Sequence, residues 1–186
     1  MRALVLWPMP CRQRRNLAGL MTADYEIRAA ELVDATDLAA LWNPWISTTI
    51  ATFNAQVKTV ADMVAMISER KLGYGFWVAE SDGAIVGFAT YSQFRGGVGY
   101  AKSMEHTIVL DATAHGRGIG RALMAVVERD AVAKGAHAMI AGVAGENAAG
   151  RDFHAKLGYE IVATLPQVGY KFDRFHDLIV MQKFLT

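Results

Sequence analysis

Apolar residues follow two different periods along this chain, and the periods predict where strands and helices lie. Alternating or short continuous apolar runs predict strands over residues 25–29, 76–80, 85–92, 107–110, 138–143, 162–164 and 178–184. Apolar residues at helical spacing predict helices that begin after Asp34, after Thr59, at Ile119 and after Asn147. The pattern therefore predicts a mixed α/β domain with helices on both faces of a twisted sheet.

Polar residues and glycines mark where several of these elements begin and end. Asp34 is placed to cap the first helix, while Thr59 and Asp62 have the spacing of a capping-box variant for the second. Gly73 and Gly135 stand where the second and third helices are expected to end. Residues 81–83, Ser-Asp-Gly, separate two strand patterns and predict a hairpin turn.

Composition narrows the class of protein. The 186 residues suit one domain, and a hydrophobic content of 53% is ample for a core. A net charge of +1 gives no reason to expect nucleic acid or an acidic membrane as a partner. A single cysteine excludes an internal disulfide and suits a reducing cytoplasm, and no apolar run approaches the roughly 18 residues of a membrane span.

Residues 1–21 differ from the rest of the chain. They carry four arginines and no acidic residue before Met21. Their apolar segment, residues 3–7, is shorter than the roughly 7–15 residues of a signal-peptide core. We expect this leader to be disordered or to reflect an incorrectly assigned start at Met1 instead of Met21, with a single domain over residues 22–186.

The strongest chemical signal is the run of residues 115–121, His-Gly-Arg-Gly-Ile-Gly-Arg, between a predicted strand and a predicted helix. Glycines at a helix N-terminus let the backbone approach a ligand closely, and the free amides and the helix dipole attract an anion such as a pyrophosphate. The run lacks the Gly-Lys-Ser/Thr of a P-loop, and its spacing is not that of a dinucleotide fold. A glycine-rich turn without a ligand is the alternative.

The order of strand, glycine-rich turn, helix, strand and short helix resembles the GCN5-related N-acetyltransferase (GNAT) superfamily. Its pattern is Gln/Arg-x-x-Gly-x-Gly/Ala, and residues 115–120 give His-Gly-Arg-Gly-Ile-Gly, so His115 departs at the first position and Gly118 and Gly120 match. Further motifs resemble the phosphinothricin and methionine sulfoximine N-acetyltransferase subgroup: residues 41–45 (LWNPW), 51–53 (ATF), 94–95 (FR), 103–107 (SMEHT), 147–149 (NAA), 153–159 (FHAKLGY) and 169–172 (GYKF). The resemblance spans residues 27–184 and implies a mostly antiparallel sheet with splayed strands.

The resemblance implies acetyl-CoA as co-substrate, with no metal, and assigns residues to it. The backbone of Ile108, Val109 and Leu110 would pair with the pantetheine arm, and Asn147 would bond the same arm. The pyrophosphate would lie on the turn and be neutralised by flanking arginines, which gives the set Gly116, Arg117, Gly118, Ile119, Gly120 and Arg121. Gly150 stands where relatives commonly carry Ser or Thr, which removes a hydroxyl from this end of the site.

Two residues are candidates for the catalytic chemistry. Glu105 occupies the position of the subgroup's proposed catalytic glutamate and can take the ammonium proton of the acceptor, although a solvated strand glutamate is the alternative. His154 lies where many relatives carry a tyrosine that protonates the departing thiolate, although a packed helix histidine is the alternative. His106 alternates to the other face of the strand from Glu105 and is expected to be structural.

The acceptor site is expected to contain Phe53, Arg95 and Tyr100, with Arg95 binding a substrate carboxylate. Trp42 and Trp45 are candidate walls of the pocket, although core packing is the commoner fate of such residues. The loop over residues 96–102 departs most from the subgroup, because glycines replace bulkier residues there. The departure leaves the identity of the acceptor open.

Together these features predict a cytoplasmic N-acetyltransferase that acetylates the α-amino group of a small amino acid or analogue, of the phosphinothricin, methionine sulfoximine or methionine sulfone type. Direct attack on the thioester is expected, because the only cysteine, Cys11, lies outside the domain. The alternatives are a protein or peptide N-terminal acetyltransferase and a non-catalytic acyl-CoA-binding module. Residues 169–171, with Arg174 and Asp177, resemble a C-terminal motif that often belongs to a dimer interface, so a homodimer is expected.

Overall fold

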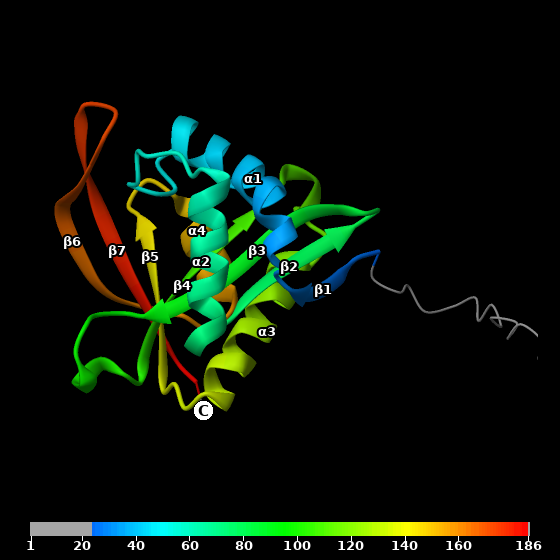
Figure 1. Ribbon diagram of the computed structural model, residues 1–186. Helices are drawn as coiled ribbons and strands as arrows, with labels where there is room; N and C mark the ends of the chain where they lie inside the picture. The colour runs from blue at the N-terminus through cyan, green and yellow to red at the C-terminus, as the bar shows by residue number, and fades with distance from the viewer. Residues whose placement is uncertain (1–23, 186) are drawn as a thin grey trace, which may run out of the picture.

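A seven-stranded sheet forms the centre of the computed structural model, which describes residues 24–185 (Figure 1). The strands lie in the order β1-β2-β3-β4-β5-β7-β6. Every neighbouring pair is antiparallel except β4 and β5, which are parallel. The expected leader, residues 1–21, and Cys11 within it lie outside the described residues.

The strands occupy the segments that the apolar pattern predicts. Their bounds are Glu26–Ala29 (β1), Phe76–Ser81 (β2), Ala84–Gln93 (β3), Ser103–Leu110 (β4), Ala138–Ala144 (β5), Glu160–Lys171 (β6) and Arg174–Phe184 (β7). The last two strands are much longer than predicted. Most of β6 is exposed on both faces and its pairing with β7 is interrupted by register shifts, so no regular alternation marks its length.

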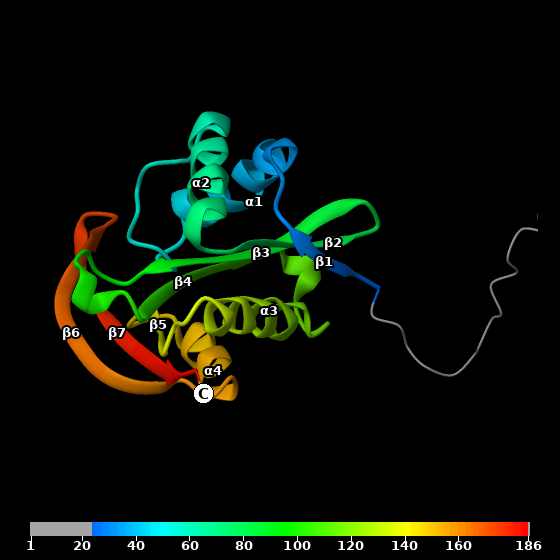
Figure 2. The same ribbon diagram turned by 60° about the horizontal axis from the view of Figure 1, so that its bottom comes forward.

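The helices form a layer on each face of the sheet (Figure 2). Helices α1 (Ala35–Thr48) and α2 (Val60–Gly73) cover one face, while α3 (Ile119–Ala133) and α4 (Ala148–Lys156) cover the other. Each layer encloses its own buried cluster: Leu38, Ile46 and Met63 pack under α1 and α2, whereas Leu123 and Met139 belong to the cluster under α3. Within residues 24–185, no helix has the length and hydropathy needed to cross a bilayer.

The predicted capping box is confirmed at α2, and the predicted cap of α1 is wrong in its chemistry. Thr59 Oγ1 accepts from the Asp62 amide at 3.1 Å, and an Asp62 carboxylate oxygen accepts from the Thr59 amide at 2.8 Å. Asp34 is the N-cap residue of α1, but its carboxylate makes no capping bond to the amides of α1. It accepts from the Glu31 amide at 2.7 Å, in the turn before α1, and from the guanidinium of Arg28 on β1 at 2.7 and 2.9 Å, so both oxygens are already engaged.

The parallel pair β4–β5 separates partway along its length. Only Ser103, Met104 and Glu105 pair with β5, opposite Ala138 to Ile140. Beyond this point β5 remains paired with β7 as far as Ala144, and β4 remains paired with β3 as far as Leu110. The strands therefore form a fork, and the β5-facing edge of β4 beyond Glu105 has free backbone groups.

Candidate active site

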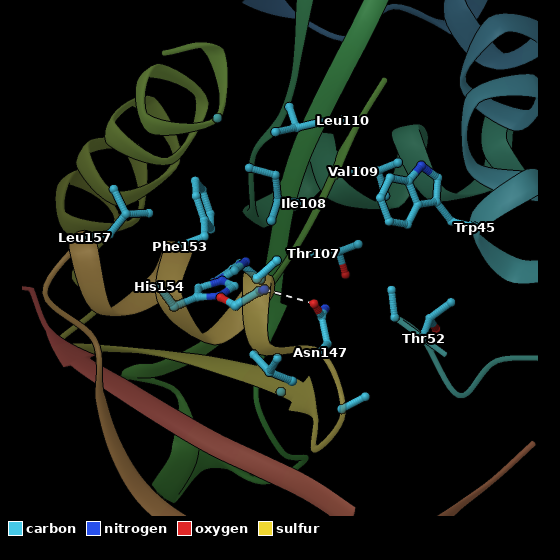
Figure 3. A pocket seen from close by; sticks show the side chains of 18 of the residues that line it. Trp45, Thr52, Thr107, Ile108, Val109, Leu110, Asn147, Phe153, His154 and Leu157 are labelled. Atoms are coloured by element: carbon cyan, nitrogen blue, oxygen red, sulfur yellow. Dashed lines mark hydrogen bonds between the residues drawn. The ribbon is translucent and has the colours of Figure 1, made fainter. Parts of the chain in front are cut away.

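A cavity of about 1070 Å³ occupies this fork. In Figure 3, Phe153 and His154 of α4 and Leu157 just after it lie on one side, Trp45 and Thr52 lie on the other, and β4 runs between them. The lining residues come from α1 and the loop after it, β3, β4, the glycine-rich turn and the start of α3, β5, α4 and β7. The cavity thus passes through the sheet and reaches both faces.

The glycine-rich turn forms one end of the cavity. Gly116 and Gly118 have φ angles of +72° and +78°, which L residues rarely adopt, and a Cβ on either would meet no atom within 4 Å. Gly118 is the N-cap residue of α3 and supplies no side chain to its first amides. These amides are therefore available to an anion, and the cradle fits a pyrophosphate.

The two arginines beside the cradle differ in direction. Arg121 lines the cavity, whereas Arg117 turns away and donates to Ser81 Oγ at 2.9 Å and to the Asp24 carbonyl at 3.2 Å. The side chain of Ile119 is fully buried in the core, so this residue has only its backbone to offer a ligand. The structure thus brings Gly116, Gly118, Gly120 and Arg121 together at the cavity and leaves Arg117 and Ile119 out of its lining.

The freed strand supplies the middle of the cavity. Ile108, Val109 and Leu110 all line it. Ile108 and Leu110 pack toward the cluster under α3, and Val109 belongs to the cluster under α1 and α2. Their side chains therefore anchor the strand in both cores, while the backbone edge that β5 leaves free can pair with an amide-rich chain such as pantetheine.

Asn147 caps α4 at the cavity wall. Its Oδ1 accepts from the Gly150 amide at 2.9 Å, the bond drawn in Figure 3. A Cβ on Gly150 would lie 2.5 Å from Asn147 Nδ2. The side chain of Asn147 therefore folds over Gly150, which gives a physical reason for glycine at a position where relatives commonly carry Ser or Thr.

We expect Gly150→Ala to displace the Asn147 cap and to lower the free energy of unfolding by about 1 kcal/mol, the usual cost of losing an N-cap. The Kd for acetyl-CoA should rise in the same variant, because Asn147 lines the cavity. Urea unfolding and calorimetric titration measure the two quantities. Ala148→Ser, at an exposed position of the same turn that does not line the cavity, is the control; equal effects in both variants would contradict the account.

Glu105 lies where the fork opens. It is the last residue of β4 that pairs with β5, opposite Ile140, and its Oε1 would lie 3.4 Å from a Cβ built on Gly142. Within residues 24–185 its carboxylate has no hydrogen-bond or ion-pair partner. Burial raises the pKa of Glu105 above its ordinary value, because the cavity destabilises the charged form. Such a carboxylate is a better proton acceptor than a solvated one.

His154 is buried in α4 beside the cavity. Its Nδ1 lies 2.7 Å from the Gly150 carbonyl, so in the neutral ring Nδ1 carries the proton and Nε2 holds a lone pair. Nε2 is buried and has no partner within the described residues. Burial lowers the pKa of His154, with a smaller opposing effect from the bond to Gly150. In the free enzyme the ring is therefore neutral, and Nε2 is a buried acceptor without a partner among the described residues.

His106 is a cavity residue that the sequence placed only as structural. It does lie on the other face of β4 from Glu105, and its ring stacks on that of His154 with centroids 5.0 Å apart. Burial and the neighbouring His154 lower the pKa of His106 to about 3, so its ring is neutral. Because the cavity passes through the fork, both faces of β4 contribute to it, which strand alternation alone does not predict.

The expected acceptor residues separate in the structure. Phe53 lines the cavity together with Trp42 and Trp45, but Arg95 and Tyr100 do not. Both lie in the exposed loop after β3, and the Arg95 guanidinium lies 5.7 Å from the ring centre of Phe94. β3 extends to Gln93, so the loop begins beyond the strand and carries these side chains away from the fork.

Other cavity residues had no signal in the sequence. Ser92, Gly142 and Leu178 belong to strands β3, β5 and β7, and only the tertiary fold brings them to the fork. Within the described part of the chain, no group of three or more His, Cys, Asp or Glu side chains is arranged to hold a metal ion.

Comparison with known proteins identifies the family of this chain. Residues 40–159 match the model of the acetyltransferase (GNAT) family. The chain is 33% identical to the L-amino acid N-acyltransferase MnaT of Escherichia coli, over 84% of this chain and 91% of that protein. It is 32% identical to the L-methionine sulfoximine/L-methionine sulfone acetyltransferase of Salmonella typhimurium, over 84% and 92%. It is 33% identical to the phosphinothricin N-acetyltransferase of Streptomyces coelicolor, over 84% and 94%.

Solved structures share the architecture. The acetyltransferase yncA of Salmonella typhimurium, determined with its cofactor acetyl-CoA, superposes with a TM-score of 0.83 at 32% identity, covering 88% of this chain and 95% of that one. A ribosomal-protein-alanine N-acetyltransferase from Brucella melitensis superposes with a TM-score of 0.82 at 36% identity, covering 86% and 99%. The free edge of β4 and the glycine cradle fit acetyl-CoA. The chain therefore belongs to the GNAT family and is an N-acetyltransferase that uses acetyl-CoA as its donor.

Proposed function

We propose that this protein acetylates the α-amino group of a small amino acid or analogue, of the phosphinothricin, methionine sulfoximine or methionine sulfone type. The observation that carries the proposal is the unpaired, half-buried carboxylate of Glu105 at the mouth of the fork. The same cavity is also lined by the aromatic residues Trp42, Trp45 and Phe53. Relatives named for these acceptors support the same substrate class.

Glu105 and His154 divide the proton transfers in the proposed reaction. The acceptor arrives as an ammonium ion, and Glu105 takes one proton from it, directly or through one water. The neutral nitrogen bonds to the thioester carbonyl carbon, and the carbon–sulfur bond breaks. Nε2 of His154 takes a second proton from the nitrogen and passes it to the thiolate sulfur, so that an amide, a thiol and a protonated Glu105 result. Solvent then removes the proton from Glu105.

A panel of acceptors tests the proposal through release of free coenzyme A thiol. The panel contains phosphinothricin, methionine sulfoximine, methionine sulfone, ordinary amino acids and short peptides. We expect turnover of at least one amino acid or analogue with kcat/KM well above that of every peptide. Turnover of peptides alone would overturn the proposed acceptor class, and acetyl-CoA binding without any turnover would favour a non-catalytic acyl-CoA-binding module.

Acetylation of a protein or peptide N-terminus is the second candidate. The observation that favours it is the likeness to the Brucella structure titled as a ribosomal-protein-alanine N-acetyltransferase. A peptide acceptor must extend out of the fork, whereas the aromatic residues of α1 and the following loop suit a short acceptor. Peptides that begin with alanine therefore belong in the panel.

We also propose a homodimer in which a second copy covers the outer hairpin of β6 and β7. β6 is the edge strand of the sheet, and its backbone has one free side. The hairpin exposes large apolar side chains: Ile161, Val162, Val168, Tyr170 and Phe175. A second copy of this hairpin is a suitable partner, because its edge strand also has free backbone groups and exposed apolar side chains.

Light scattering coupled to gel filtration should therefore give twice the chain mass of 20.3 kDa. Val168→Lys places a charge on the exposed hairpin and should shift the mass toward one chain. Val33→Lys, at an exposed apolar position on the far side of the sheet, is the control and should leave the mass unchanged. A single-chain mass for the unsubstituted protein at micromolar concentration would contradict the proposal.

A further inference from the structure

Among residues 24–185, no lysine or arginine lines the acceptor end of the cavity. The cationic side chains that line the cavity, Arg121 and Lys156, belong to α3 and α4, on the other face of the sheet from α1 and its loop. Arg95, the sequence's candidate for a substrate carboxylate, lies in an exposed loop outside the lining. An amino-acid acceptor nevertheless brings a carboxylate beside Glu105, and two unneutralised anions would repel each other.

A buried ammonium lies directly behind this end of the cavity. Lys171, near the tip of the β6–β7 hairpin, is only 4% exposed, and its Nζ donates to the Thr52 carbonyl at 2.7 Å. Among residues 24–185 no carboxylate oxygen lies within 4.0 Å of Nζ. Burying a charge without an opposite charge is unfavourable, so this ammonium would be stabilised by an anion bound nearby.

The Thr52–Phe53 peptide connects Lys171 to the cavity. The peptide is trans, so the Phe53 N–H points opposite to the carbonyl that accepts from Lys171. Thr52 and Phe53 line the cavity and Lys171 does not, so the N–H points away from the ammonium, on the side of the peptide that can face the cavity. This N–H has no acceptor within the described residues. The ammonium polarises the peptide and strengthens the N–H as a donor.

The hairpin also fixes this peptide in place. The Phe53 ring stacks on His176 with centroids 5.7 Å apart, and a Cβ on Gly169 would lie 2.5 Å from the Phe53 ring. His176 is itself held by two bonds, to Glu146 Oε1 at 2.8 Å and to the Lys171 carbonyl at 3.0 Å. The peptide is therefore held in one orientation before a ligand arrives, as a binding donor requires.

We propose that the Phe53 N–H, backed by the Lys171 ammonium, is the binding site for the carboxylate of the acceptor. The inference rests on the proposed amino-acid acetyltransferase function and specifies that its acceptor is anionic. Phe53 would touch the carboxylate through its amide, and Lys171 would act through the peptide as a positioning residue. Specificity for an amino acid over a neutral amine would then depend on the β6–β7 hairpin, whose residues are distant in sequence from Phe53.

The experiment compares the best amino-acid acceptor of the panel with its primary carboxamide, which has nearly the same shape and no negative charge, at a pH high enough to deprotonate the amino group of both. Both are assayed with the unsubstituted protein, with Lys171→Met and with Lys71→Met, a control at an exposed position on α2. We expect Lys171→Met to reduce the preference for the carboxylate about tenfold, the usual size of a lost bond to a charged group. The loss should appear in the KM of the acceptor, while the KM of acetyl-CoA and the preference in Lys71→Met stay unchanged.

Equal losses of kcat/KM for the carboxylate and the carboxamide in Lys171→Met would overturn the inference, because they would show only a structural role. If Lys171→Met does not fold, the unsubstituted protein still tests the inference: a KM for the carboxamide equal to or below that for the carboxylate would overturn it. Turnover of neither acceptor would overturn the proposed function and this inference with it. Equal use of both would overturn this inference alone.

Discussion

Replacing Glu105 with Gln is expected to lower kcat by about 10²–10⁴-fold, the usual contribution of a general base, while the Kd for acetyl-CoA stays within about twofold. The amide keeps the size of the side chain but has no lone pair basic enough to take the ammonium proton. Steady-state rates with the best acceptor and calorimetric titration of acetyl-CoA measure the two effects. Glu26→Gln, at an exposed position on β1, is the matched control.

The pH dependence separates a base from a structural carboxylate. Burial raises the pKa of Glu105, and the group acts only when ionised, so kcat/KM should fall as the pH falls through this raised pKa. The acidic limb of the profile should disappear in Glu105→Gln. The substitution should not lower the unfolding midpoint at neutral pH, because burial already destabilises the charged form. An unchanged rate, or a rate loss that tracks a lower midpoint, would contradict the assignment.

The sequence predicts those parts of the site that depend on local chain geometry. Gly116 and Gly118 are needed because the turn takes a positive φ, and this requirement is visible in the residue types. The capping box of Thr59 and Asp62 is equally local and is confirmed. Glu105 was assigned from its resemblance to the subgroup's catalytic glutamate, and in the structure it is the last residue of β4 that pairs with β5.

Contacts between distant segments could not be predicted in this way. Lys171 and Thr52 are 119 residues apart, and no periodicity relates the end of a hairpin to the loop after the first helix. The stack of His106 on His154 joins a strand to a helix across the fork. Arg95 was assigned by residue type, since a guanidinium suits a carboxylate, but the direction of a loop is not encoded in the type of one residue. In the structure Arg95 lies outside the cavity lining.

The second large effect is expected at Gly120, where the requirement for glycine has a different cause from that at Gly118. Gly120 lies in the first turn of α3 and has no positive φ, but a Cβ there would be 2.9 Å from Leu110 Cδ1 and 3.0 Å from Phe153 Cε2. The helix end thus packs closely on the freed strand and on α4. Gly120→Ala would force these elements apart, and overpacking of this kind usually costs about 1–3 kcal/mol.

This free-energy cost should appear as weaker binding of acetyl-CoA. The same turn presents the free amides of the cradle, and Gly120 lines the cavity. We expect Gly120→Ala to raise the Kd for acetyl-CoA about tenfold or more, since about 1.4 kcal/mol corresponds to a factor of ten. The rate at saturating acetyl-CoA should change less, because Glu105 and His154 belong to other elements. Gly73→Ala, at a helical position with no atom within 4 Å of the new Cβ, is the control and should leave the Kd unchanged. An unchanged Kd in Gly120→Ala would mean that the first turn of α3 tolerates displacement, and the pyrophosphate site would then depend on the backbone of Gly116 and Gly118 alone.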